Sequence, residues 1–169
     1  MPSVSRPVIA ALLLILAAMP TIVPAEAQPA DTAPVTLQSP AAFLGYDLGE
    51  QFTPHHRVVD YVQHVAAASP RVTVRRYGTS IEGRPLLLAT IASEENHEQI
   101  DVIRQNNLRR AGMADGRVSG PTAAVVWLSY NVHGNESVST EAAMQTLFEL
   151  GDPSNDRTAD WLSRSEEHT

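Results

Sequence analysis

The stretch that decides the fold runs from residue 123 to residue 136 and reads AAVVWLSY followed by NVHGNE. Its first part, Ala123–Tyr130, is almost continuously apolar, which predicts a strand buried on both faces in the middle of an α/β sheet. The polar residues Asn131–Glu136 come directly after it. Open α/β sheets bind ligands at the carboxyl ends of their strands, so the sequence predicts a functional site here.

Two residues of this polar segment have side chains that suit a metal. His133 and Glu136 are separated by two residues, of which Gly134 would let the backbone bend sharply. An imidazole nitrogen and a carboxylate oxygen aimed at one point suit zinc, which accepts both. The same spacing also suits an ordinary hydrogen bond between the two side chains, and the spacing alone leaves both interpretations open. Ser137 is interpreted as a helix N-cap, since no G-x-S-x-G motif surrounds it.

The other histidines of the body are weaker candidates for a metal site. His55, His56 and His64 lie on or beside the first predicted helix, without a clear metal spacing, and we interpret them as solvated surface. His97 lies among glutamates, on what we expect to be a polar helix face. His133 and Glu136 are therefore the candidate metal ligands.

Helices are predicted on both sides of the apolar stretch. Thr53 is expected to cap a helix that has Pro54 at its first position and ends at Ser69–Pro70. Its apolar residues recur with helical spacing at Val58, Tyr61, Val62 and Val65. Further helices are predicted over 94–110, capped by Ser93 and with Ile100, Ile103 and Leu108 inward, and over 138–150.

Two shorter runs have strand character. Residues 72–77 alternate and residues 86–91 are apolar, with a turn at 78–83 between them, so we expect a β-hairpin. The order of elements then predicts an α/β fold: a mixed sheet with helices on both faces.

The composition excludes several classes of function. The chain has 169 residues, a formal net charge of −7 and no cysteine, so disulfides, thiolate catalysis and cysteine zinc sites are excluded. All 12 basic residues are arginine, which excludes a Schiff-base lysine and a P-loop lysine. The acidic balance argues against nucleic acid as the main partner.

The first residues have the features of a targeting segment. Residues 1–27 combine Arg6, the apolar run Val8–Met19 and the small-x-small sequence Ala25-Glu26-Ala27, as a secretory signal peptide does. The alternative is a membrane anchor, but the apolar run is short for a span, which needs about 20 residues. We expect cleavage, no stable membrane insertion afterwards, and a periplasmic or secreted location. Residues 28–40 are expected to form a proline-spaced linker.

Three features together resemble a known family. The segment Tyr77–Leu86, the apolar run that follows it and His133–Glu136 resemble the zinc carboxypeptidase family, peptidase family M14. The resemblance implies a carboxypeptidase-like fold, with residues 41–162 as the N-terminal part of the catalytic domain. It also implies one Zn²⁺ ion held by His133 and Glu136. The family's third zinc ligand, a His, and its general base, a Glu, come later, and we expect both beyond the end of this chain.

The resemblance implies an exported zinc metallopeptidase that acts on peptide or protein substrates. Two alternatives stay open. Digestive carboxypeptidases usually have Arg where this chain has Asn135, and a Gly-Asn pair there is typical of aspartoacylase and succinylglutamate desuccinylase. A zinc-dependent N-acyl amino acid deacylase is therefore the second hypothesis, and a non-catalytic exported binding module is the third. The export signal and the Glu82-Gly83-Arg84 turn favour the peptidase.

The last residues, 163–169, are expected to be an artefact tail. From Arg164 onward they match the translation of a common sequencing-adapter sequence, and a natural acidic tail is the alternative. On this interpretation the chain is a truncated fragment that is inactive alone.

Overall fold

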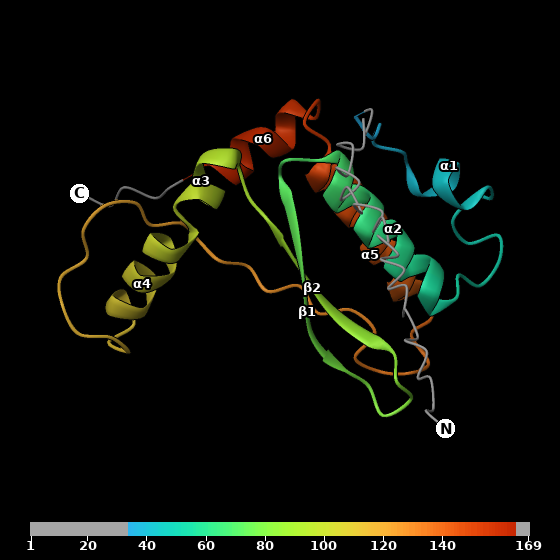
Figure 1. Cartoon of the computed structure of the whole chain (residues 1–169), viewed down its shortest axis with the longest axis horizontal. Coiled ribbons are helices and arrows are strands. Elements are labelled where there is room, and N and C mark those ends of the chain that lie inside the picture. Colours follow the sequence, from blue (N-terminus) through green and yellow to red (C-terminus); the bar gives the residue numbers. More distant parts are fainter. Residues whose placement is uncertain (1–33, 165–169) are drawn as a thin grey trace, which may run out of the picture. The chain divides into compact units, whose positions relative to one another are not determined.

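The computed structural model describes residues 34–164, so the predicted signal peptide, the start of the linker and the end of the predicted tail lie outside the described residues. Six helices and two strands follow one another within the described part (Figure 1). Their bounds are α1 Pro40–Leu44, α2 His55–Ala68, β1 Val72–Thr79, β2 Pro85–Ile91, α3 Glu94–Glu98, α4 Ile100–Arg110, α5 Val138–Gly151 and α6 Asp156–Ser163. None of these helices combines the length and the apolar character that a membrane span requires.

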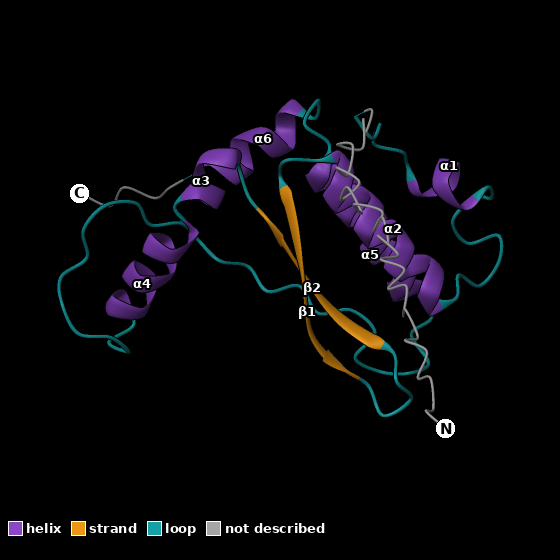
Figure 2. Cartoon of the chain, viewed as in Figure 1, coloured by secondary structure: helices purple, strands orange, loops and turns teal. Residues whose placement is uncertain are grey.

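The predicted hairpin is confirmed. β1 and β2 pair antiparallel from Val72 opposite Ile91 to Thr79 opposite Pro85, with an irregularity between Arg76 and Gly78 (Figure 2). Gly83 closes the turn with φ 77°, a conformation that a residue without a side chain adopts readily. The α/β class is therefore confirmed, and the mixed sheet stays a prediction.

The core lies between α2, α5 and β1. Its buried apolar residues are Tyr61, Val65, Val72, Met144 and Leu147. The spacing of Tyr61 and Val65 places both on one face of α2, as their helical period predicts. Gly151, at the end of α5, faces this core so closely that an added Cβ would lie 3.1 Å from Val65 Cγ1. The absence of a side chain at residue 151 thus lets α5 approach α2.

The segment before α1 contacts the core. Leu37 packs against the core, and Gln38 is held on both sides of its backbone. Its N–H donates to His64 Nε2 over 3.1 Å, and its carbonyl accepts from the Tyr61 hydroxyl over 3.1 Å. Burial raises the pKa of Tyr61, so this hydroxyl keeps its proton and donates.

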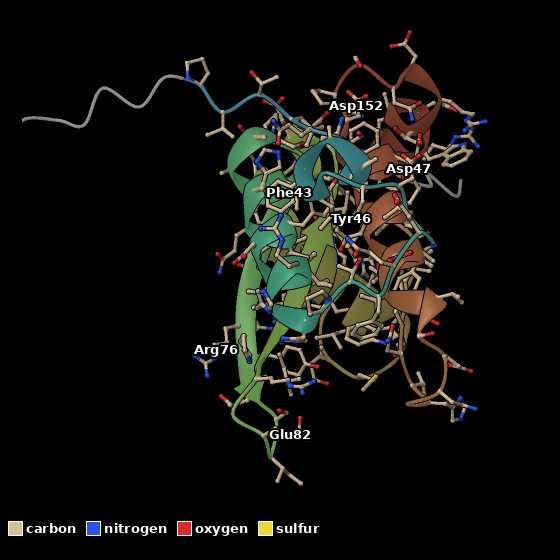
Figure 3. All side chains as sticks on the ribbon, turned by 90° about the vertical axis from the view of Figure 1, so that its right-hand side faces the viewer. Phe43, Tyr46, Asp47, Arg76, Glu82 and Asp152 are labelled. Atoms are coloured by element: carbon tan, nitrogen blue, oxygen red, sulfur yellow. The ribbon has the colours of Figure 1, made fainter. Side chains whose placement is uncertain are left out.

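His64 is therefore not the solvated surface residue that the sequence suggests. Its ring also lies 5.0 Å from the ring of Phe43 on α1, whose side chain is labelled in Figure 3. Phe43 packs in turn edge-on against Tyr61, with ring centroids 5.2 Å apart. Because α1 and α2 are separated in the sequence, no local pattern predicts the aromatic contacts between them.

The predicted helix 94–110 is divided into α3 and α4. Gln99, between them, has φ −109° and ψ 11°, outside the helical range. Ser93 caps α3 as predicted, through the N–H of Asn96. His97 is not on a free polar face, because its Nε2 lies 2.9 Å from the carbonyl of Arg71. Asn96 Nδ2 also donates to the carbonyl of Leu162 over 2.9 Å. The direction of α3 is therefore fixed by residues outside α3 and α4.

The three residues expected to face inward from this helix differ in how deeply they are buried. Ile103 is buried at 2% exposure and Leu108 is half-buried, whereas Ile100 is 40% exposed and not inward as predicted. Asn106, fully buried, instead holds the following loop through the carbonyls of Ser119 and Pro121.

The largest correction concerns the predicted buried strand Ala123–Tyr130. In the described structure this stretch is loop, as Figure 2 shows between α4 and α5, and it pairs with neither strand. From Ala124 onward its side chains are exposed, with Val126 at 77% and Trp127 at 71%. A strand this apolar needs hydrogen-bonded neighbours and a covering layer on both faces. A two-stranded hairpin could pair with this strand along only one of the strand's two edges and would leave the other edge without a partner.

Candidate metal centre

The candidate ligands lie in a tight loop that joins the exposed apolar stretch to α5. Asn131 enters this loop with φ 55° and is the one residue other than glycine with a positive φ in the described chain. Gly134, expected to make the bend, does not have a positive φ, and a Cβ there would meet nothing within 4 Å. The chain bends at Val132 and His133 and then turns at Gly134 and Asn135, the central residues of the turn that the bond from the Glu136 N–H to the His133 carbonyl closes, so the bend predicted at Gly134 is confirmed. The residue type of Asn131 was the signal for its positive φ, since Asn tolerates the left-handed region better than most residues.

His133 and Glu136 are brought together by this loop. His133 Nδ1 lies 3.0 Å from Glu136 Oε1, and the His133 backbone N–H donates to Glu136 Oε2 over 3.4 Å. The loop is closed by a bond of 3.1 Å from the N–H of Glu136 to the carbonyl of His133. The side chains are 72% and 46% exposed. Both candidate ligand atoms thus converge on one point that solvent can reach.

The geometry of this pair fits two ligands of a zinc ion. Two donor atoms, each about 2.1 Å from a tetrahedral zinc, lie about 3.4 Å apart. The observed 3.0 Å between Nδ1 and Oε1 differs from this by only a few tenths of an ångström. Within residues 34–164 no group of three or more His, Cys, Asp or Glu side chains could hold a metal. The described chain therefore offers a pair of ligands, whereas a catalytic zinc has three and a water.

Two hydrogen bonds fasten the chain before the ligands to α5. Asn131 Nδ2 donates to Thr140 Oγ1 over 2.7 Å, and the Tyr130 hydroxyl donates to Thr146 Oγ1 over 3.1 Å. Thr146 Oγ1 donates back to the carbonyl of Ala142 over 2.8 Å, which leaves its lone pairs for Tyr130. Ser137 occupies the N-cap position as predicted, although its side chain makes no capping bond.

A cleft of about 980 Å³ lies beside this loop. Its walls come from four places: the start of α2, the turn end of the hairpin, the ligand loop and the start of α5. Residues from these walls include His55, His56, Tyr77, Glu82, Arg84, Asn131, Ser137 and Thr140. Arg84 pairs with Glu82 over 2.9 Å in the exposed turn, where Figure 3 labels Glu82.

A polar clamp ties one wall of the cleft to α5. Glu141 accepts from the N–H of Gly49 over 2.6 Å and from Thr53 Oγ1 over 2.7 Å. Tyr46 extends the clamp, with its hydroxyl 2.9 Å from Thr53 Oγ1. Thr53 was expected to cap α2, but Pro54 occupies that position and the Thr53 hydroxyl points to Glu141 instead. Sequence reasoning missed Glu141 because its partners lie far away in the chain.

Comparison with known protein families gives a match over the second and third thirds of the chain. Residues 58–166, more than half of the chain, match a family model described as zinc carboxypeptidase. The matched range includes the hairpin, His133 and Glu136. Neither a curated protein nor a solved structure matches the chain.

Proposed function

The chain belongs to the zinc carboxypeptidase family, and from this premise we propose that it carries part of the zinc site of an exported carboxypeptidase. The observation that carries the proposal is the convergence of His133 Nδ1 and Glu136 Oε1 to 3.0 Å in an exposed loop. The family match supports the reaction class, which is hydrolysis of peptide bonds.

His133 and Glu136 would hold the metal. For Nδ1 to offer its lone pair, the imidazole must be neutral with its proton on Nε2. Glu136 can offer Oε1 while Oε2 keeps the backbone N–H of His133, which holds the carboxylate in its orientation. When bound, zinc supplies Lewis-acid chemistry toward the scissile carbonyl and lowers the pKa of water.

The cleft beside the loop is the proposed binding place for the peptide. It borders the ligand loop through Asn131, Gly134 and Ser137. We propose that the third ligand and the general base come from outside residues 34–164. The described chain alone is then expected to bind zinc weakly and to hydrolyse no peptide.

One observation favours a second candidate. Gly134-Asn135 between the ligands is the pair expected in an N-acyl amino acid deacylase, which uses the same pair of zinc ligands. A non-catalytic binding module on the same scaffold would be recognised by the loss of the third ligand or of the general base. Assays of the full-length protein on C-terminal peptide bonds and on N-acyl amino acids separate the three functions.

The test of the peptidase uses three variants of the full-length protein. His133→Ala and Glu136→Ala should each abolish release of C-terminal amino acids, because each removes a ligand. Glu95→Ala, which removes an exposed carboxylate from α3, should leave the activity unchanged. Full activity in either ligand variant would refute the assignment.

Export is tested on the same preparation, whose N-terminal residue should be Gln28 if residues 1–27 are removed.

A further inference from the structure

The backbone adopts a left-handed conformation at the first residue of the ligand loop, before the loop bends at Val132 and turns at Gly134. Asn131 has φ 55°, in the left-handed region where a Cβ crowds the carbonyl oxygen. Short polar side chains such as Asn occupy this region more easily than β-branched ones. Non-glycine residues held there often lie at functional sites. The direction in which the backbone enters the ligand loop therefore depends on what occupies residue 131.

The side chain of the same residue closes the loop from outside. Asn131 Nδ2 donates to Thr140 Oγ1 over 2.7 Å, from the start of the loop to the first turn of α5. His133 and Glu136 both lie between these two anchor points in the sequence. This bond thus joins the two ends of the segment that presents the ligands.

Little else in the described structure holds the ligands. Their side chains are 72% and 46% exposed and lie outside the core cluster, so packing does not fix them. Within the loop, the N–H of Glu136 bonds to the carbonyl of His133 over 3.1 Å, and the N–H of Ser139 to the carbonyl of Glu136 over 3.0 Å. Apart from the contacts of the pair with each other, its orientation follows from the loop backbone, which Asn131 anchors at its start.

We propose that Asn131 is a positioning residue for the metal site. Its left-handed backbone and its bond to Thr140 hold the ligand loop in the geometry that brings His133 and Glu136 together. The metal role of the pair rests on the proposed function, whereas the ordering of the loop does not. Both Asn131 and Thr140 line the cleft, so their substitution opens no cavity in the core.

Paired substitutions separate the backbone from the side chain. Asn131→Val places a β-branched residue in the left-handed region and removes the amide, and Thr140→Val removes only the hydroxyl at nearly constant shape. Each has a conservative partner. Asn131→Asp tolerates the same backbone and can accept from the Thr140 hydroxyl, and Thr140→Ser keeps the hydroxyl.

The first readout needs no metal. Amide hydrogen exchange of the full-length protein is followed at Glu136 and Ser139, whose N–H groups bond within the loop. Asn131→Val and Thr140→Val should both exchange faster than the wild type, and the two conservative variants should exchange like it. Wild-type exchange rates in both valine variants would overturn the proposal. If Asn131→Val fails to fold, Thr140→Val alone decides this readout, because it leaves the backbone of residue 131 unchanged.

The second readout is binding of Co²⁺, whose visible absorption reports the coordination geometry. Removing a group that orients a metal ligand typically weakens metal binding by about 10–100-fold. Asn131→Val should lose at least about tenfold in Co²⁺ affinity and change the spectrum, whereas Asn131→Asp should stay within about twofold of the wild type. Equal weakening in the Asp and Val variants would contradict a positioning role for residue 131.

The failure of the two proposals can be told apart. If His133→Ala binds Co²⁺ as tightly as the wild type, the proposed function fails, and the exchange rates at Glu136 and Ser139 still decide the role of Asn131. If His133→Ala loses Co²⁺ while Asn131→Val binds and exchanges like the wild type, the metal site stands and the positioning role is wrong.

Discussion

Two valines show how the two apolar regions of the molecule differ. Val65 is fully buried on α2, and Val126 is 77% exposed in the loop before the candidate ligands. Val65 belongs to a cluster built by α2, α5 and β1, whereas residues 123–130 pair with neither described strand. An apolar sequence indicates that burial would be favourable. The burial itself depends on partners elsewhere in the chain.

The largest expected effect comes from truncating the buried valine. Val65→Ala should lower the free energy of unfolding by about 2 kcal/mol, because it removes two methyl groups and leaves a cavity beside Val72 and Gly151. Val126→Ala makes the same chemical change on the surface and should stay within about 0.5 kcal/mol of the wild type. Urea unfolding of the mature chain measures both. Equal losses would mean that the stretch 123–130 is buried in solution.

A buried polar contact should have a somewhat smaller effect. Thr53 is 2% exposed and donates to Glu141, so Thr53→Val should cost about 1–2 kcal/mol by leaving the carboxylate with one partner fewer. Thr53→Ser keeps the hydroxyl and serves as the control. The same unfolding experiment checks this prediction, which would fail if the Ser and Val variants were equally stable.

The exposed stretch should affect association more than stability. Val126→Lys should change the free energy of unfolding by no more than about 0.5 kcal/mol, since the side chain already faces solvent. It should nevertheless raise the solubility limit of residues 28–164, because a charge interrupts an apolar, unpaired segment that could pair between copies. Light scattering against concentration measures this. Unchanged scattering would show that the stretch does not drive association.

The smallest expected effect is a pH dependence from His64. Burial holds the pKa of His64 below its ordinary value of about 6.5, and the neutral ring accepts the N–H of Gln38. The unfolded chain therefore takes up the proton first as the pH falls. Stability from this residue is complete above about pH 6.5 and decreases as the pH falls from there toward the lower pKa of the folded state.

His64→Gln is the matched variant for this effect, because the amide oxygen can still accept from Gln38 but does not titrate. The difference in unfolding free energy between wild type and variant should change between pH 7 and pH 5, with the wild type losing more. A constant difference over that range would contradict the assignment of this pH dependence to His64.

Local patterns predicted the elements that are stabilised locally. The alternation in β1, the helical spacing of Tyr61 and Val65, and the cap at Ser93 each depend on neighbouring residues, and all three are present. The division of 94–110 at Gln99 depends on bonds to residues outside the helix. Residues 123–130 are likewise exposed because no strand of the described chain pairs with them.

The candidate site divides in the same way. The spacing of His133 and Glu136 was enough to predict that their side chains meet, because both lie in one loop. The bond from Asn131 to Thr140 and the clamp at Glu141 could not be predicted, since each joins segments that come together only in the folded chain. The turn predicted at Gly134 is present, whereas the positive φ at Asn131 was not predicted.

The central claim, that His133 and Glu136 hold zinc, is tested most directly by metal content after equilibrium dialysis against Zn²⁺. The full-length wild type and Glu95→Ala should each retain one zinc per chain. His133→Ala and Glu136→Ala should retain far less, because each would leave too few protein ligands for a stable site. Full zinc content in either ligand variant, with the fold intact by circular dichroism, would contradict the account.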